Sequence, residues 1–94
     1  MNLRDNYKYT HISTATTTTV STIPCVLVAV IVNTTAAGTI TLDDAITATT
    51  PTIAIMKASI AEATYEYKVL CTVGLTVVTA GASDITVVTA TSPF

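Results

Sequence analysis

Polar and apolar residues alternate over short stretches of this chain, and turn-forming residues separate the stretches. The separation is about ten residues, which is typical of all-β proteins. The clearest alternation covers residues 64–71 and puts Tyr65, Tyr67 and Val69 on one face. Residues 25–32 are instead apolar at every position, which predicts a central strand covered on both of its faces.

The pattern as a whole predicts seven or eight short strands. They are expected over residues 14–22, 24–33, 39–43, 52–57, 64–71, 75–79 and 85–90, and residues 7–12 fit either a further strand or an extended arm. Residues 33–38 are expected to form a hairpin connection, since Gly38 can adopt a positive φ. The last two strands are expected to pair as a second hairpin. Residues 58–63 are the one stretch that suits a helical turn.

Composition supports the all-β interpretation, because 42 of the 94 residues are Thr, Val or Ile. Their β-branched side chains crowd a helix but suit a pleated sheet. Layer packing then favours a two-sheet antiparallel β-sandwich, and the absence of Trp favours a jelly-roll-like over an immunoglobulin-like arrangement. We expect an N-terminal extended arm over residues 1–13 and a single sandwich domain over residues 14–94.

Charge excludes several classes of function. Only 11% of the residues are charged and the formal net charge is −2, so the chain lacks the basic stripe that binding to nucleic acid or to an anionic membrane surface requires. The continuous apolar stretch over residues 23–32 is half the length of a membrane-spanning helix, which needs about 20 residues. The polar start of the chain predicts no signal peptide. Low charge in a chain that is 50% hydrophobic suggests a surface held against other protein.

Residues capable of catalysis are scarce, and we expect neither an enzyme nor a cofactor. The single histidine, His11, has no neighbouring metal-ligand or triad spacing. Asp43 and Asp44 are adjacent and should point to opposite faces, although with Thr47 and Thr49 they offer an alternative, a Ca²⁺-binding loop. Threonine pairs separated by one residue recur at irregular spacing, so threonine is interpreted as the outward residue of many strands.

The two cysteines, Cys25 and Cys71, both lie in apolar strand patterns. Buried free cysteine behaves as a small hydrophobic residue, and this is the favoured interpretation. A single disulfide between facing strands is the alternative.

The N-terminal arm is the predicted partner-binding segment. It carries Leu3, Arg4, Tyr7 and Tyr9, and Tyr and Arg are enriched among the residues that dominate interface energetics. No catalytic, metal-binding or cofactor-binding residue is predicted.

Two stretches carry a resemblance to a known class of proteins. Residues 24–42 read Pro-Cys-Val-Leu-Val-Ala-Val-Ile-Val-Asn-Thr-Thr-Ala-Ala-Gly-Thr-Ile-Thr-Leu. Residues 63–79 read Ala-Thr-Tyr-Glu-Tyr-Lys-Val-Leu-Cys-Thr-Val-Gly-Leu-Thr-Val-Val-Thr, and Asp-Ile-Thr-Val-Val follows at 84–88. Over roughly residues 14–90 the chain resembles small all-β virion proteins of tailed bacteriophages, of the head-decoration or head-fibre type.

This resemblance implies a jelly-roll-like sandwich bound to a capsid or tail, often as a trimer. The expected function is that of a non-enzymatic capsid decoration protein, made in the host cytoplasm, which binds the major capsid protein on the head surface. The alternative is a tail, neck or fibre-associated protein, either structural or binding a receptor or glycan. The resemblance assigns no catalytic or cofactor-binding residue.

Overall fold

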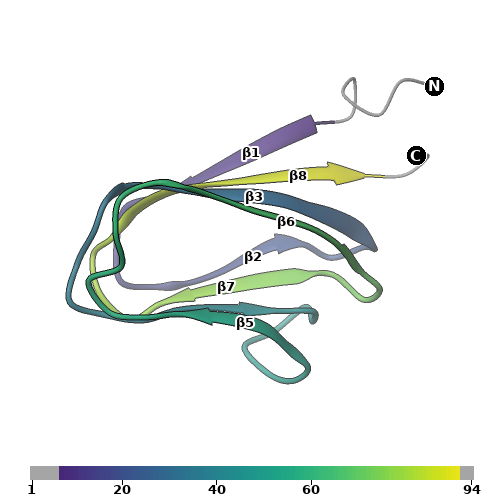
Figure 1. Ribbon diagram of the computed structural model, residues 1–94. Coiled ribbons are helices and arrows are strands. Elements are labelled where there is room, and N and C mark those ends of the chain that lie inside the picture. The colour runs from purple at the N-terminus through teal and green to yellow at the C-terminus, as the bar shows by residue number, and fades with distance from the viewer. Residues whose placement is uncertain (1–6, 92–94) are drawn as a thin grey trace.

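The computed structural model describes residues 7–91 and folds them into eight strands without a helix (Figure 1). The strands are β1 (Tyr7–Ile12), β2 (Thr17–Ser21), β3 (Cys25–Thr34), β4 (Ile40–Asp43), β5 (Thr52–Met56), β6 (Thr64–Cys71), β7 (Leu75–Thr79) and β8 (Asp84–Thr91). The all-β prediction is therefore confirmed. The helical turn expected over residues 58–63 does not form, and these residues make turns and bends that lead into β6.

Two four-stranded antiparallel sheets face each other. The first has the order β1-β8-β3-β6 and the second β2-β7-β4-β5. Figure 1 shows them as two layers, with the first sheet above the second and the chain turning between them at both ends. Within residues 7–91 only the β4–β5 connection joins strands of the same sheet, and every other connection crosses from one sheet to the other. An eight-stranded, two-sheet sandwich with this order is a jelly roll, as the sequence predicted.

Both predicted hairpins are wrong. Residues 33–38 connect β3 to β4, which lie in different sheets, and β7 and β8 also lie in different sheets. A local pattern shows two extended segments joined by a turn, but it does not show which strands will be neighbours. That choice depends on which arrangement buries both apolar faces at once.

The core lies between the inner faces of the two sheets. Its largest fully buried side chains include Leu27, Ile40, Leu42, Leu75 and Ile85. Strand β3 is central in the first sheet, as predicted, and lies between β8 and β6. However, only one face of β3 points into the core, and Val26, Val28 and Ile31 remain partly exposed.

The sandwich begins earlier than the expected boundary at residue 14. Residues 7–12 form β1, which pairs with β8 from Tyr7↔Ala90 to Ile12↔Ile85. Ile12 is 4% exposed and belongs to the core. The segment expected as an extended arm is therefore an edge strand over these residues, because its alternation places an apolar side chain inside the sandwich. The remainder of the expected arm, residues 1–6, lies outside the described residues.

Candidate functional site

The outer face of the first sheet is the candidate functional site. Directly opposed residues of neighbouring antiparallel strands share a face of the sheet, so the pairing defines rows that run across all four strands. The rows are Tyr7–Ala90–Val26–Leu70, Tyr9–Val88–Ala29–Glu66 and His11–Thr86–Ile31–Thr64. The first two rows are apolar apart from their tyrosine hydroxyls and Glu66.

Much of this apolar surface is open to solvent. Tyr7 is 47% exposed, Tyr9 75% and Leu70 55%. Partly exposed aliphatic side chains fill the space between them, namely Val26, Val28, Ile31 and Val88. The charged residues Glu66 and Lys68 lie at the margin, on edge strand β6. Contiguous exposed apolar surface of this kind is typical of interaction sites, and this makes the face the candidate site.

The outer face of the second sheet differs in chemistry. Its rows are Thr17–Val78–Thr41–Ile55 and Thr19–Thr76–Asp43–Thr52. Part of it is covered by the β4–β5 loop, since the hydroxyl of Thr76 donates to the Ala45 carbonyl at 2.9 Å and that of Thr19 donates to the Ile46 carbonyl at 3.2 Å. Hydroxyl groups therefore outnumber aliphatic groups on this outer face, although Ile55 is 64% exposed there, and aliphatic and aromatic groups prevail on the other.

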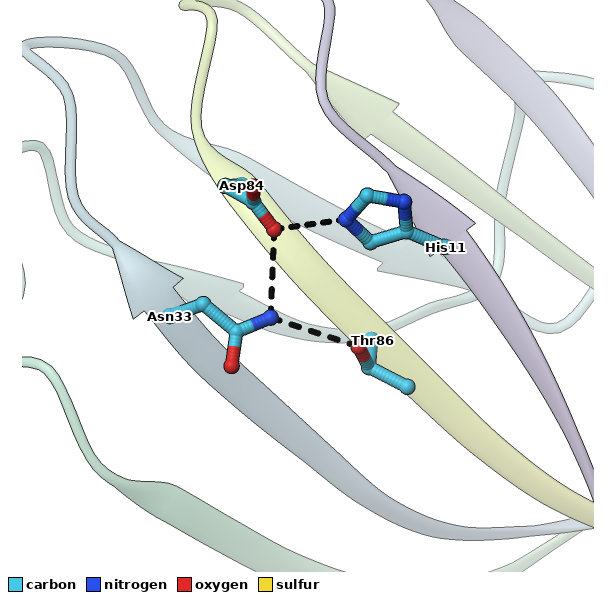
Figure 2. Close-up of polar contacts among 4 residues, drawn as sticks. All are labelled: His11, Asn33, Asp84 and Thr86. Atoms are coloured by element: carbon cyan, nitrogen blue, oxygen red, sulfur yellow. Dashed lines mark hydrogen bonds and ion pairs between the residues drawn. The ribbon is translucent and has the colours of Figure 1, made fainter.

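A polar cluster closes one end of the apolar face (Figure 2). His11 Nε2 on β1 lies 2.7 Å from Asp84 Oδ1 on β8. Asn33 Nδ2 on β3 donates to the same Asp84 oxygen at 3.1 Å and to Thr86 Oγ1 at 3.3 Å. The hydrogen bond from His11, followed by that from Asn33, lowers the pKa of Asp84. The cluster joins side chains from three adjacent strands at the edge of the apolar surface.

The chemistry of this cluster is that of a hydrogen-bond network around the Asp84 carboxylate. Thr86 Oγ1 accepts a hydrogen bond from Asn33, and the pair His11–Asp84 is itself half-exposed. Residues 7–91 form no pocket for a small molecule. Among them, no group of three or more His, Cys, Asp or Glu side chains lies close enough together to hold a metal ion. Because its hydrogen bonds join side chains of β1, β8 and β3, we interpret the cluster as holding these three strands in position relative to one another.

The predicted partner-binding residues divide into two groups. Leu3 and Arg4 lie outside the described residues. Tyr7 and Tyr9 lie on β1 and both point to the outer face of the first sheet, in neighbouring rows. Sequence reasoning thus selected two residues of this surface but assigned them to an arm.

The other residues of the surface were missed, although the sequence held a signal for them. Residues 25–32 are apolar at every position, but the sandwich covers only one face of β3. The side chains expected to be buried on the second face are Val26, Val28 and Ile31, and they form the middle of the candidate surface. The signal that locates the site is therefore an apolar run in a strand of which the sandwich covers only one face.

The two adjacent aspartates contact different parts of the molecule. Asp43 is buried and accepts a hydrogen bond from the Thr52 hydroxyl at 2.9 Å. Asp44 holds the β6–β7 loop: its Oδ2 accepts from the Thr72 amide and hydroxyl at 2.9 and 3.0 Å, and its Oδ1 accepts from the amides of Val73 and Gly74 at 2.9 and 3.3 Å. Both carboxylates thus accept hydrogen bonds from the protein itself, and this arrangement does not suit the Ca²⁺-binding loop that was the alternative for them.

Desolvation works to raise the pKa of Asp44, but the hydrogen bonds from Val73, Thr72 and Gly74 outweigh it and lower the pKa. The charge of this residue therefore stabilises a turn at the end of the sandwich.

Both cysteines are free thiols buried in the core, which agrees with the favoured interpretation of the sequence.

No family model, curated protein or solved structure matches this chain. In the part of the chain that the structure describes, no helix has the length and apolar character needed to cross a bilayer. By its strand order and its surface, the chain is an eight-stranded jelly-roll sandwich with one apolar outer face.

Proposed function

We propose that this protein is a non-enzymatic structural protein of a tailed-phage virion, which decorates and stabilises the capsid by binding the major capsid protein on the head surface. The proposal rests chiefly on the apolar outer face of the β1-β8-β3-β6 sheet. In water this face leaves Tyr7, Tyr9 and Leu70 largely exposed, and burying such side chains against another protein is favourable in proportion to the apolar area removed from water.

The dimensions of the face suit a protein partner. Four strands about 4.8 Å apart, each six to ten residues long, give a sheet face of roughly 400–600 Å² in projection. A specific interface buries about 800 Å² on each partner, and the corrugation and rim of the face add to its projected area. The resemblance over residues 14–90 supports a capsid as the setting and a homo-oligomer, in particular a homotrimer, as the assembled form.

Localisation on the particle tests the proposal directly. Virions of the phage that encodes this chain would be imaged after immunogold labelling, and its copies per particle would be counted by quantitative mass spectrometry. We expect label over the whole head surface and a copy number that scales with the number of capsid subunits. Label confined to the tail or neck, with few copies, would contradict decoration and favour the tail-associated alternative. Absence of the chain from the particle would overturn the virion proposal altogether.

The contribution of the tyrosines needs substitutions rather than truncation. Deleting residues 1–10 would remove most of β1 as well as Leu3 and Arg4, because β1 pairs with β8 from Tyr7 onward. Substituting Tyr7 and Tyr9 by Ser leaves the backbone pairing in place and removes only the aromatic surface. We expect these variants to fold as the wild type does and to lose capsid binding, whereas unchanged binding would remove the two tyrosines from the interface.

A further inference from the structure

The two cysteines form a directly opposed pair in the first sheet. Cys25 is the first residue of β3 and Cys71 the last residue of β6, and the two are register partners. Both side chains are fully buried and both thiols are free. Both also point into the core, since each belongs to the same buried cluster as Leu27.

The geometry of such a pair suits a disulfide. Directly opposed residues in antiparallel strands have Cα atoms about 4.5 or 5.5 Å apart, depending on the type of pair. Disulfides form over Cα separations of about 4.4–6.8 Å when the Cβ atoms point toward one another. A bond between Cys25 and Cys71 is therefore compatible with the strand register as it stands.

The surroundings of the two thiols shift their pKa values in opposite directions. The hydrogen bond from Cys71 lowers the pKa of Cys25 against the opposing effect of burial, and the Ser21 hydroxyl acts in the same direction as Cys71. The same contact with Cys25, together with burial, raises the pKa of Cys71. The carboxylate of Asp44 is the charged group nearby, and it raises both values. Since the thiolate is the nucleophile in thiol–disulfide exchange, the lowered pKa of Cys25 favours it over Cys71 as the attacking group.

We propose that Cys25 and Cys71 are a redox-active dithiol, which an oxidising small-molecule disulfide such as oxidised glutathione converts to an intramolecular disulfide joining β3 to β6. The Cys25 thiolate attacks one sulfur of oxidised glutathione, the glutathione S–S bond breaks, and one glutathione leaves as a thiolate. The Cys71 thiol then loses its proton to solvent, and its sulfur attacks Cys25 Sγ and releases the second glutathione. Two protein thiols are oxidised, and one glutathione disulfide is reduced to two thiols.

Access to the pair comes from one end of the sandwich. Cys25 follows the β2–β3 connection and Cys71 precedes the β6–β7 loop, whose backbone is held by Asp44. Local opening of these two connections exposes the thiols without unfolding the sheets. A protein that folds in a reducing compartment keeps the dithiol, and transfer to an oxidising compartment locks the fold. This inference concerns the chain by itself and does not depend on the proposed function.

The test treats the folded, reduced full-length protein with oxidised glutathione near pH 8, quenches with acid, and alkylates in denaturant before mass spectrometry. We expect both thiols to disappear together, with a mass loss of about 2 Da, no retained glutathione and full reversal by dithiothreitol. The oxidised monomer should melt at least about 10 °C higher than the reduced protein. Two alkylatable thiols after treatment, a stable glutathione adduct in the wild type or a disulfide-linked dimer would each overturn the proposal.

Single serine variants distinguish the roles of the two sulfurs. Cys71→Ser should stop at a stable glutathione adduct on Cys25, because the resolving thiol is missing. Cys25→Ser should react several-fold more slowly than Cys71→Ser, because burial and the Asp44 carboxylate still raise the pKa of Cys71 in that variant, whereas the Ser21 hydroxyl still lowers the pKa of Cys25 in the other. Equal rates for the two variants would contradict the assignment of Cys25 as attacking group. Circular dichroism and thermal melting of each variant confirm that the sandwich is intact before the rates are compared.

Discussion

At the scale of single residues, Gly38 shows how two distant loops fix the fold. A side chain built at Gly38 would place its Cβ 2.3 Å from the backbone nitrogen of Gly81 and 2.8 Å from the carbonyl carbon of Ala80. The sequence suggested a positive φ as the reason for this glycine, but none of the described glycines has one. The reason is instead the close approach of the β3–β4 and β7–β8 loops, which the Ala80 amide secures by donating to the Thr39 carbonyl at 2.9 Å.

This close approach makes Gly38→Ala a destabilising substitution. The added methyl group meets backbone rather than a flexible side chain, so the loops must move apart, and we expect the free energy of unfolding to fall by about 1–3 kcal/mol in urea denaturation. Gly81→Ala is the matched control, because its Cβ would lie 3.2 Å or more from the nearest atoms. That variant should stay within about 1 kcal/mol of wild type, since the lower entropy of the unfolded chain offsets the tight contact. Equal losses in the two variants would contradict this account of the loop contact.

Asp44 makes stability depend on pH in the acid range. Its folded-state pKa lies below the ordinary value of 3.8, so the unfolded chain binds the proton more readily than the folded chain does. The stabilising contribution is therefore fully present above about pH 4 and is lost as the pH falls through the folded-state pKa. Asp44→Asn should reduce the free energy of unfolding by about 1–2 kcal/mol at pH 7, a value that allows for partial solvent screening.

Urea denaturation at pH 7, 5 and 3 measures this effect. The difference between wild type and Asp44→Asn should be the same at pH 7 and 5 and should shrink at pH 3. Asp84, whose pKa is also lowered, continues to titrate in the variant, so some acid sensitivity should remain. A difference that stays constant down to pH 3 would mean that the carboxylate charge does not stabilise the β6–β7 loop.

At the scale of elements, β1 decides where the sandwich begins. Its Ile12 side chain is in the core, whereas its Tyr9 side chain is 75% exposed on the outer face. Ile12→Ala should therefore cost about 2–4 kcal/mol in the free energy of unfolding, and Tyr9→Ala less than about 1 kcal/mol. Chemical denaturation of both variants gives the comparison. Unchanged stability in Ile12→Ala would mean that residues 7–12 are an arm after all.

How far the sequence predicts this fold differs from element to element. The strand over residues 64–71 is recovered because its alternation is complete and depends only on local side-chain direction. The two predicted hairpins fail because strand pairing in a jelly roll is non-local: β8 pairs with β1 and β3, and β7 with β2 and β4. Such pairings depend on the joint burial of two sheet faces, which no single segment encodes.

The candidate site follows the same division. Tyr7 and Tyr9 were selected from residue type alone, and the structure puts them on the apolar face. Val88 and Leu70 could not be selected, because their membership depends on register with β3, which becomes visible only when the sheet order is known. The hydrogen bonds from the β6–β7 loop to Asp44 could not be predicted from the sequence either, since they join residues 28 to 30 positions apart.

At the scale of the whole molecule, the two outer faces divide the surface of the sandwich by chemistry. The molecule exposes 4875 Å² in total, so a standard interface of about 800 Å² would cover roughly one-sixth of it. The first sheet presents valine, isoleucine, leucine and tyrosine, whereas the second presents mainly threonine together with Val78, Ile55 and the covering β4–β5 loop. If the protein binds a capsid, burial of the outer face of the first sheet lowers the free energy of the complex most, because this face removes the most apolar surface from water.

Matched charge substitutions on the two faces test this asymmetry. Tyr7 and Leu70 stand at opposite ends of one row of the first sheet, and Thr17 and Ile55 stand at opposite ends of one row of the second. Replacing either pair by lysine adds the same charge at exposed positions, so both double variants should keep the wild-type fold. We expect Tyr7→Lys with Leu70→Lys to weaken binding to shells of the major capsid protein by at least about 100-fold, because two buried apolar contacts become desolvated charges.

The control pair, Thr17→Lys with Ile55→Lys, should bind within about threefold of wild type in the same co-sedimentation assay, a difference under 1 kcal/mol. Equal weakening by both pairs would assign the effect to net charge rather than to the apolar face, and the assay repeated at higher salt separates these causes because screening acts on long-range charge. Loss of binding only in the control pair would move the interface to the threonine-rich sheet. The apolar face would then need another partner, and a second copy of this chain would be the first to examine.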